Sequence, residues 1–313
     1  MANNLFQIIF FPGFLFLLFL GLVFQFIDRK VYARIQNRQG PPWFQPLADL
    51  IKLLGKEDII PASADPLMFT LMPVFAVAGV VTAYLYIPTW GAQPLFSFYG
   101  DLIVVVYLLT IPGFTFFLGG WFSASLYSLI GAMRSQIQFF SYEVPMFLAV
   151  LAPALLANTW SMNEMAKFYS EHPGYWIINL LGFAVAIVAL IGKLERVPFD
   201  SPEAETEIIA GSFTEYGGRF LAFFRLALDM ELVVGASLIA AVFFPFGLNF
   251  HPFVGFFIYL LKIALVILIT TFARAIMARL RIDQMVEFCW TYLAPAAIVQ
   301  VIISLIAKGV LNR

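Results

Sequence analysis

The sequence contains very few of the side chains that most often bind metals, clusters or haem. Its one cysteine, Cys289, excludes an internal disulfide and any iron–sulfur cluster held by this chain alone. Its two histidines, His172 and His251, each precede a proline in an expected loop, and we interpret both as turn residues. The sequence therefore predicts no metal or other cofactor bound by this chain.

Charged residues are also scarce. Asp, Glu, Lys and Arg make up 12% of the 313 residues, whereas 62% are hydrophobic and the mean hydropathy is +0.90. This composition favours a surface that faces a lipid bilayer over one that faces water.

Long apolar stretches recur along the chain. A membrane-spanning helix needs about 20 mostly apolar residues, and the stretches do not alternate as the strands of a membrane barrel do. Eight stretches meet this length: 5–27, 66–88, 101–122, 141–158, 176–194, 220–246, 253–273 and 286–307. We predict an all-α integral membrane protein that forms a single polytopic domain over residues 1–313.

Basic residues are distributed unevenly between the two sides. The connections after the first, third, fifth and seventh helices, with the adjoining helix ends, hold 13 of the 18 Lys and Arg residues. The opposite side holds only Lys167, Lys308 and Arg313. Since basic loops stay in the cytoplasm, both termini are predicted to lie on the outer side.

The first cytoplasmic connection contains a short amphipathic pattern over residues 43–55. Leu47, Leu50, Ile51 and Leu54 recur at helical spacing, and the other face carries Asp49, Lys52 and Lys56. We predict a helix that lies along the membrane surface. Its function is either interfacial anchoring or partner docking.

Several ionisable residues fall inside the expected spans, where each unpaired charge costs about 3 kcal/mol. The candidates for function among them are Glu143, Arg225, Asp229, Glu231 and Lys262. Arg225 and Asp229 are four residues apart on one helix face and can pair, so Glu231 needs another partner, for which Lys262 is a candidate. The residues predict either a proton relay or static buried ion pairs.

The cytoplasmic segment over residues 195–219 is strongly acidic. From Lys193 to Arg219 six acids accompany three bases, and such a balance disfavours contact with anionic lipid headgroups. Asp200 or Ser201 can cap a helix that has Pro202 and Glu203 in its first turn. Capping explains only two or three acids, so we predict that this acidic loop faces a protein partner, a water-filled cavity or both.

Ordered motifs over nearly the whole chain resemble a known family. They are Asp28-Arg29-Lys30, Ala33-Arg34, Arg38, Gly40-Pro41, Gln45-Pro46, Asp49-Leu50-Ile51-Lys52, Lys56-Glu57-Asp58-Ile59-Ile60-Pro61, Gly131-Ala132-Met133-Arg134, Ser141-Tyr142-Glu143, Arg196, Pro198-Phe199-Asp200, Glu203-Ala204-Glu205, Thr214-Glu215-Tyr216 and Ala278-Arg279-Leu280-Arg281-Ile282-Asp283. The chain resembles the membrane subunit shared by respiratory complex I (the H subunit of NADH:quinone oxidoreductase) and the energy-converting membrane-bound hydrogenases.

This resemblance implies eight spans plus a surface helix in a prokaryotic plasma membrane. It implies a non-catalytic subunit that joins a cytoplasmic electron-transfer arm, with hydrogenase-like large and small subunits, to antiporter-like membrane subunits that move protons or sodium. Iron–sulfur clusters, and a nickel–iron site in some members, belong to those partners. No nucleic-acid partner is implied.

The resemblance also assigns residues to two functions. The implied ion-translocation or coupling residues are Glu143, Glu203, Glu205, Glu207 and Glu215, beside the intramembrane Asp229, Glu231 and Lys262. The implied arm-facing residues are Arg34, Arg38, Asp49, Lys52, Arg279 and Arg281.

Two segments resemble the hydrogenase or sulfur-reducing branch more than complex I. Quinone-type members usually have a longer Gly-Pro-Asn-Arg-Val-Gly-Pro segment before the surface helix, where this chain has Gly40-Pro41-Pro42, and the segment Met277-Ala278-Arg279-Leu280-Arg281-Ile282-Asp283 also resembles the hydrogenase branch. Members commonly have a Glu five residues before the Pro of Pro-Phe-Asp, where this chain has Lys193. Either Glu195 substitutes for that acid or the acid is dispensable here, so its quinone- or proton-linked role is not transferred to this chain. The alternatives are a quinone-chamber subunit of a complex I and a stand-alone secondary transporter, although no internal repeat of the transporter type is evident.

Overall fold

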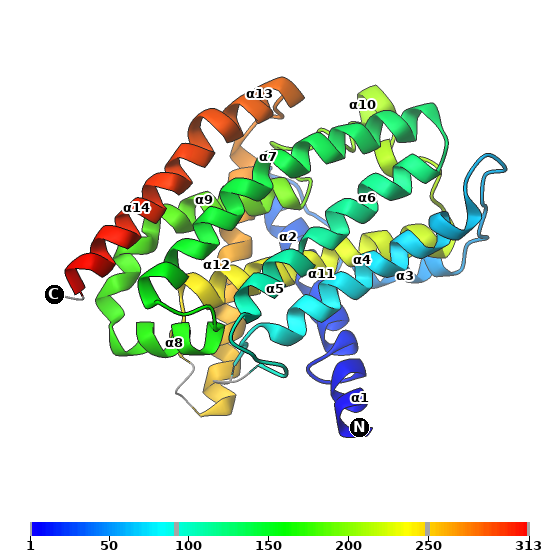
Figure 1. Ribbon diagram of the computed structural model, residues 1–313. Helices are drawn as coiled ribbons and strands as arrows, with labels where there is room; N and C mark the ends of the chain where they lie inside the picture. The colour runs from blue at the N-terminus through cyan, green and yellow to red at the C-terminus, as the bar shows by residue number, and fades with distance from the viewer. Residues whose placement is uncertain (1, 91–93, 248–250, 312–313) are drawn as a thin grey trace.

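The computed structural model describes residues 2–90, 94–247 and 251–311, which form helices and loops without a strand (Figure 1). In chain order the α-helices are α1 (Ala2–Ile9), α2 (Phe14–Ile35), α3 (Gln45–Leu54), α4 (Pro66–Tyr86), α5 (Asp101–Leu108), α6 (Thr110–Phe122), α7 (Leu126–Ala157), α8 (Met162–Glu171), α9 (Leu180–Lys193), α10 (Glu205–Ile208), α11 (Gly218–Phe243), α12 (Pro252–Ile276), α13 (Ile282–Phe288) and α14 (Ala294–Leu311). Short 3₁₀ turns cover Pro173–Asn179 and Gly211–Phe213, and a π-helical turn covers Cys289–Leu293.

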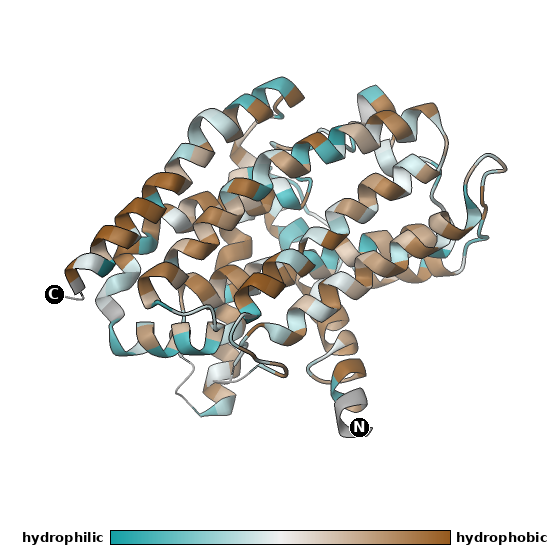
Figure 2. Ribbon diagram, in the orientation of Figure 1, coloured by the Kyte–Doolittle hydropathy of each residue, from teal (hydrophilic) through white to brown (hydrophobic). Residues whose placement is uncertain are grey.

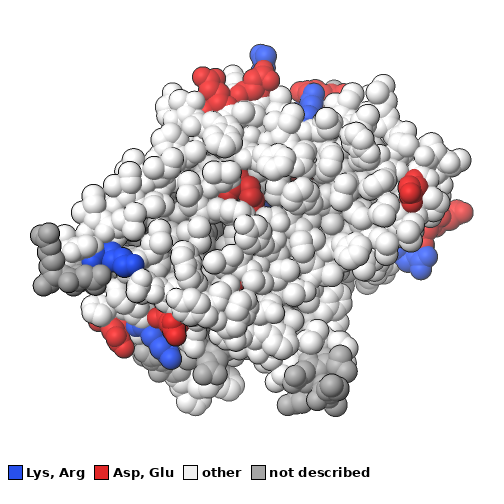
Figure 3. Space-filling view, viewed as in Figure 1, with Lys and Arg blue, Asp and Glu red and all other residues white. Residues whose placement is uncertain are grey.

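The eight predicted spans are confirmed. The helical stretches of the described chain that are long and apolar enough to cross a membrane are Phe6–Ile35, Pro66–Tyr86, Asp101–Phe122, Leu126–Ala157, Gly174–Lys193, Gly218–Phe243, Pro252–Ile276 and Ile282–Val310. Apolar residues dominate these helices (Figure 2). On the face shown in Figure 3, most charged side chains gather toward the periphery of the molecule, and the area between them is largely uncharged apart from acidic atoms near its centre.

The fourth span differs most from its prediction, because α7 begins at Leu126 and not near residue 141. Its first turns contain polar residues that look like a loop in the sequence. Ser135 and Gln138 are buried, however, and Gln138 donates a hydrogen bond of 2.8 Å to the carbonyl of Gly192. Inward-facing polar groups with partners therefore extend the helix beyond its apolar stretch.

Helix α11 is the centre of the bundle. Most of its length is buried, and it packs against α2, α4, α9 and α12. The predicted surface helix is confirmed as α3, which lies against α2 and α11 and leaves Leu47, Ile51 and Leu54 exposed. This arrangement brings the acids of α11 close to the charged ends of α2 and α9.

The acidic loop folds differently from its prediction. Across the described backbone between α9 and α11, no helix is capped by Asp200 or Ser201, and the only α-helix is the four-residue α10, preceded by Ala204. Pro202 is buried, and the backbone passes so close to it that a Cβ on Gly211 would lie 1.8 Å from the Pro202 oxygen. The tight packing of this turn overrides the local capping preference.

A second close approach ties this loop to α7 and predicts a packing effect. A Cβ on Gly131 would lie 2.4 Å from the backbone carbon of Gly211 and from the backbone nitrogen of Ser212. We expect Gly131→Ala to lower the free energy of unfolding by about 1–3 kcal/mol through overpacking, measured as a lower thermal midpoint in detergent. The matched control is Gly309→Ala in α14. A Cβ on Gly309 would have no atom of the described chain within 4 Å, apart from its chain neighbours and the nearby backbone of its own helix. Equal midpoints for the two variants would contradict this packing.

Candidate functional site

A lysine lies between two glutamates in the interior of the bundle. The Lys193 ammonium at the end of α9 is 3.5 Å from a carboxylate oxygen of Glu143 on α7 and 3.7 Å from one of Glu231 on α11. The side chains are 1%, 7% and 1% exposed, respectively. The Lys193 ammonium also lies 5.7 Å from the ring centroid of Tyr142. We call Glu143, Lys193 and Glu231 the central triad.

The central triad is loosely bonded for a buried ionic group. A well-formed N–H···O bond between charged partners is about 2.8 Å long, so both Lys193 contacts are long. One oxygen of Glu143 and both oxygens of Glu231 lack a hydrogen-bond partner among the described residues. Two carboxylates share one ammonium, so the triad has a net charge of −1 unless it binds a proton. The triad therefore lacks the short contacts and additional hydrogen bonds that offset the cost of burying charges.

The chain turns sharply directly after Lys193. The Glu195 N–H donates to the carbonyl of Gly192 and the Arg196 N–H to that of Ile191, a Schellman termination of α9. Glu195 has a φ of +50°, the left-handed conformation that glycine usually supplies. A non-glycine residue in this position is typical of a site where its side chain is needed.

The side chain of Glu195 is held by a single short hydrogen bond. The Ser135 hydroxyl donates to one carboxyl oxygen at 2.6 Å, and the other oxygen has no partner in the described chain. The pKa of Glu195 is raised to about 8, mainly by burial. The nearby acids Glu203, Glu231 and Asp200 also raise this pKa, and the Ser135 hydrogen bond lowers it. The neutral acid is therefore the dominant form at neutral pH.

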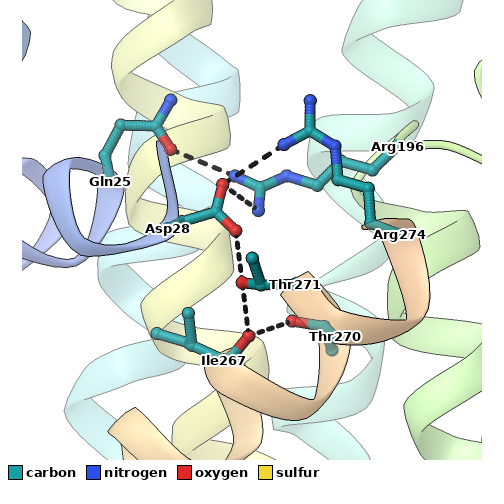
Figure 4. Close-up of polar contacts among 7 residues, drawn as sticks. All are labelled: Gln25, Asp28, Arg196, Ile267, Thr270, Thr271 and Arg274. Atoms are coloured by element: carbon teal, nitrogen blue, oxygen red, sulfur yellow. Dashed lines mark hydrogen bonds and ion pairs between the residues drawn. The ribbon is translucent and has the colours of Figure 1, made fainter. Parts of the chain in front are cut away.

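A second buried cluster surrounds Asp28 near the end of α2 (Figure 4). The Asp28 carboxylate, 1% exposed, lies 2.8 Å from Arg196 and 3.3 Å from Arg274. It also accepts a hydrogen bond of 2.6 Å from the Thr271 hydroxyl. Gln25 accepts a hydrogen bond of 3.1 Å from Arg196. These contacts join α2 and α12 to the turn after α9.

A polar cavity of about 460 Å³ separates the Asp28 cluster from the acidic loop. Its wall includes Glu195 and Arg196. It also includes two partly exposed ion pairs, Arg29–Asp49 at 2.9 Å and Arg225–Glu203 at 3.2 Å. The ionisable residues of the wall are Asp28, Arg29, Asp49, Glu195, Arg196, Asp200, Glu203, Arg225, Asp229 and Arg274. Small-molecule pockets are lined mostly by apolar side chains. The many ionisable residues in this wall make the cavity better suited to hydrated charges.

Ion pairs also hold the acidic loop against the helices. Glu207 lies 2.6 Å from Arg134 on α7 and 3.5 Å from Arg279 after α12. The Arg134 hydrogen bond lowers the pKa of Glu207. At the end of the loop, the Arg219 N–H and guanidinium both bond to Asp58, which lowers the pKa of Asp58. Three separate parts of the chain thus meet at this loop.

Comparison with known proteins identifies the family. The family model described as NADH dehydrogenase matches residues 7–305. The chain belongs to the NADH dehydrogenase family. Among its relatives, the H subunit of the NADH-quinone oxidoreductase of Dehalococcoides mccartyi (strain CBDB1) is 36% identical over 292 residues, which cover 90% of this chain and 81% of the relative. The corresponding protein of Bacillus thuringiensis (strain Al Hakam) is 36% identical over 295 residues, covering 90% and 87%.

A solved structure extends the likeness to the fold. A chain of the membrane-bound sulfane sulfur reductase, an archaeal respiratory membrane complex, superimposes with a TM-score of 0.86 at 29% identity. The match covers 97% of this chain and 98% of that one. The resemblance drawn from the motifs is therefore confirmed, including its extent over nearly the whole chain.

The structure brings some of the predicted coupling residues of this family member together. Glu143 and Glu231 meet at Lys193, and Glu203 and Asp229 line the cavity. Glu207 and the half-buried Glu215 lie in the acidic loop. The side chain of Glu205 lies outside the described part of the structure. The functional assignment of all these residues stays a prediction.

Two predicted partnerships are wrong. Arg225 pairs with Glu203, and Asp229, four residues along the same face, makes no ion pair within the described chain. Glu231 pairs with Lys193, whereas the Lys262 ammonium bonds to the carbonyl of Phe246. Helical spacing shows which residues share a face, but the neighbouring helix decides which of them pair.

The predicted arm-facing residues lie on the same side as the acidic loop. Asp49 pairs with Arg29, Arg279 with Glu207 and Arg281 with Asp283. The other three, Arg34, Arg38 and Lys52, are exposed.

Sequence reasoning missed Lys193, Asp28 and Arg274 as site residues. For Lys193 the available signal was a lysine at the end of a 14-residue helix that has no acid of its own. For Asp28 the signal was an acid directly after an apolar stretch, residues 5–27. Both signals indicate burial only once the helix ends are placed correctly.

The central triad predicts a large effect for removal of its cation. Lys193→Met keeps an apolar side chain of similar length but leaves two buried carboxylates facing each other. We expect a loss of about 3–5 kcal/mol in the free energy of unfolding, measured in detergent at neutral pH. Lys167→Met, at an exposed lysine of α8, is the control. Adding Glu231→Gln to Lys193→Met is expected to recover part of the lost stability. If the double variant recovers none of it, Lys193 and Glu231 are not coupled.

Glu195 predicts a specific pH dependence. Its pKa in the folded protein, about 8, lies above its ordinary value of 4.5, so the folded state binds the extra proton. Its contribution to stability is complete below the ordinary pKa and is lost as the pH rises through about 8. Between about pH 5 and pH 8, the wild type loses stability relative to Glu195→Gln, as measured by the thermal midpoints of both proteins. Parallel midpoints over this range would refute the assignment.

Proposed function

We propose that the chain is the membrane anchor and coupling subunit of a respiratory complex of the hydrogenase-like or sulfur-reducing type. It links a cytoplasmic electron-transfer arm to the movement of protons or sodium. Hydrogenase-like subunits that carry iron–sulfur clusters form the arm, and antiporter-like subunits adjoin it in the membrane. The solved relative that it matches over nearly its full length is itself part of a sulfane sulfur reductase.

One observation carries the coupling part of this proposal. Ionisable side chains follow one another from the exposed Glu207, through Glu203, Asp229 and Glu195 at the cavity, toward the central triad. Displacing the acidic loop breaks exposed ion pairs and changes the field at this cavity. Because buried charges are poorly screened, such a change alters how readily the triad holds a proton.

The arm-facing surface comprises Asp49, Lys52, Arg279 and Arg281, with Arg34 and Arg38 at its membrane edge. In this orientation both termini lie on the outer side of a prokaryotic plasma membrane. The distribution of basic residues supports this placement.

A second candidate is the quinone-chamber subunit of a complex I, which the names of the relatives at 36% identity favour. The charged wall of the cavity supports the first candidate. Two measurements on the purified complex discriminate between the candidates: whether a co-purifying soluble subunit carries a nickel–iron site, and whether quinone, protons or polysulfide accept its electrons. Quinone-dependent activity alone would support the second candidate.

Glu203→Gln combined with Glu207→Gln tests the coupling directly. The double variant removes the ion pairs with Arg225, Arg134 and Arg279 without changing side-chain size. We expect electron transfer to continue while ions moved per electron, measured in proteoliposomes, fall by roughly five-fold or more. The control is Glu171→Gln, an exposed acid at the end of α8. If less complex assembles but the complex that does form moves a normal number of ions per electron, the loop serves only as a docking surface.

A further inference from the structure

An apolar groove of about 470 Å³ runs along α12 beside the last turn of α2. Every residue of its wall is aliphatic or aromatic, including Val31 and Ile35 from α2 and Leu261, Leu265, Leu268 and Phe272 from α12. The four α12 side chains are 42–69% exposed. The groove is therefore open to whatever surrounds the bundle in the membrane.

The length of the groove corresponds to one leaflet of a bilayer. From Leu261 to Phe272 an α-helix rises about 17 Å, and half of a hydrocarbon core of about 30 Å is about 15 Å. The groove occupies the half of α12 that leads to its C-terminal end, next to Ile35 at the end of α2. A membrane-spanning helix of a partner would require a complementary surface across both leaflets, whereas a single lipid chain requires this length.

Cations lie at the end of the groove where a headgroup would be. Arg34 directly precedes Ile35, and Arg38 lies 5.6 Å from the ring of Tyr32. Both arginines are exposed, and neither forms an ion pair with another residue in the described ranges. Arg274, 4.4 Å from the same ring, is engaged by Asp28. The two arginines thus have guanidinium donors available for an anionic oxygen group.

We propose that this groove binds one chain of an anionic phospholipid whose phosphate is held by Arg34 and Arg38. The apolar wall supplies affinity for the chain, and the two guanidiniums select an anionic headgroup over a zwitterionic one. Such a lipid would lie at the membrane edge of the arm-facing surface and fix the end of α2, on which Asp28 sits. The proposal does not depend on which electron acceptor or ion the complex uses.

Native mass spectrometry of the protein, purified with its accompanying subunits and then equilibrated with added lipid, tests this site. The probes are phosphatidylglycerol and phosphatidylcholine. We expect wild-type protein to retain one phosphatidylglycerol in preference to phosphatidylcholine. Arg34→Gln combined with Arg38→Gln weakens this binding by roughly thirty-fold, because two surface cations are lost. The matched double variant Lys52→Gln with Arg281→Gln removes the same charge elsewhere and retains the lipid.

Filling the groove is the second arm of the experiment. Leu265→Trp blocks it, and Ile298→Trp on α14 is the control at nearly equal exposure, 49% against 47%. We expect only Leu265→Trp to lose the bound lipid. Equal retention of the two lipids by wild-type protein would mean non-specific annular lipid and would overturn the proposal. The proposal would also be overturned if Leu265→Trp released a protein subunit while the lipid stayed bound. In that case a partner helix, not a lipid chain, would occupy the groove.

Discussion

The polar interior of the bundle is organised around one ammonium buried between two carboxylates. Removing three charged groups from water is costly, and only good geometry or further hydrogen bonds offset that cost. Here the Lys193 contacts of 3.5 and 3.7 Å are long, and three carboxylate oxygens lack hydrogen-bond partners among the described residues. The apolar packing of α7, α9 and α11 therefore holds these groups together, and the charges themselves contribute little net stability.

Four consecutive residues join the three polar features of the interior. Lys193 belongs to the central triad, Glu195 lines the cavity, and Arg196 binds Asp28. The left-handed turn at Glu195 makes this possible, because it ends α9 and redirects the chain within two residues. A glycine there would remove the backbone strain but also the carboxyl group. A movement of this turn changes all three features together, and the acidic loop begins with it.

The sequence predicted the architecture well, because lipid exposure leaves a strong compositional signal. The eight spans and α3 follow from apolar length and helical spacing alone. The start of α7 was missed because buried polar residues such as Gln138 resemble loop residues until their partners are known. The partner of Glu231 was missed for a related reason: Lys262 and Lys193 are both lysines of other helices, and only the packing shows which one approaches. Pairing between helices is a tertiary property that a one-dimensional pattern does not contain.

The identity of residue 193 changes the electrostatics of the whole interior. The family resemblance gives a glutamate as the common residue at this position, and three carboxylates in one buried site would repel one another strongly. They would have to bind two or three protons to approach neutrality. With Lys193, the same site reaches neutrality with a single proton on Glu143 or Glu231. Binding or release of one proton then changes the charge of the triad between 0 and −1. A change in the electric field at the cavity needs to shift only this one protonation equilibrium. The proposed coupling through a displacement of the acidic loop therefore requires only one protonation equilibrium at the central triad to change.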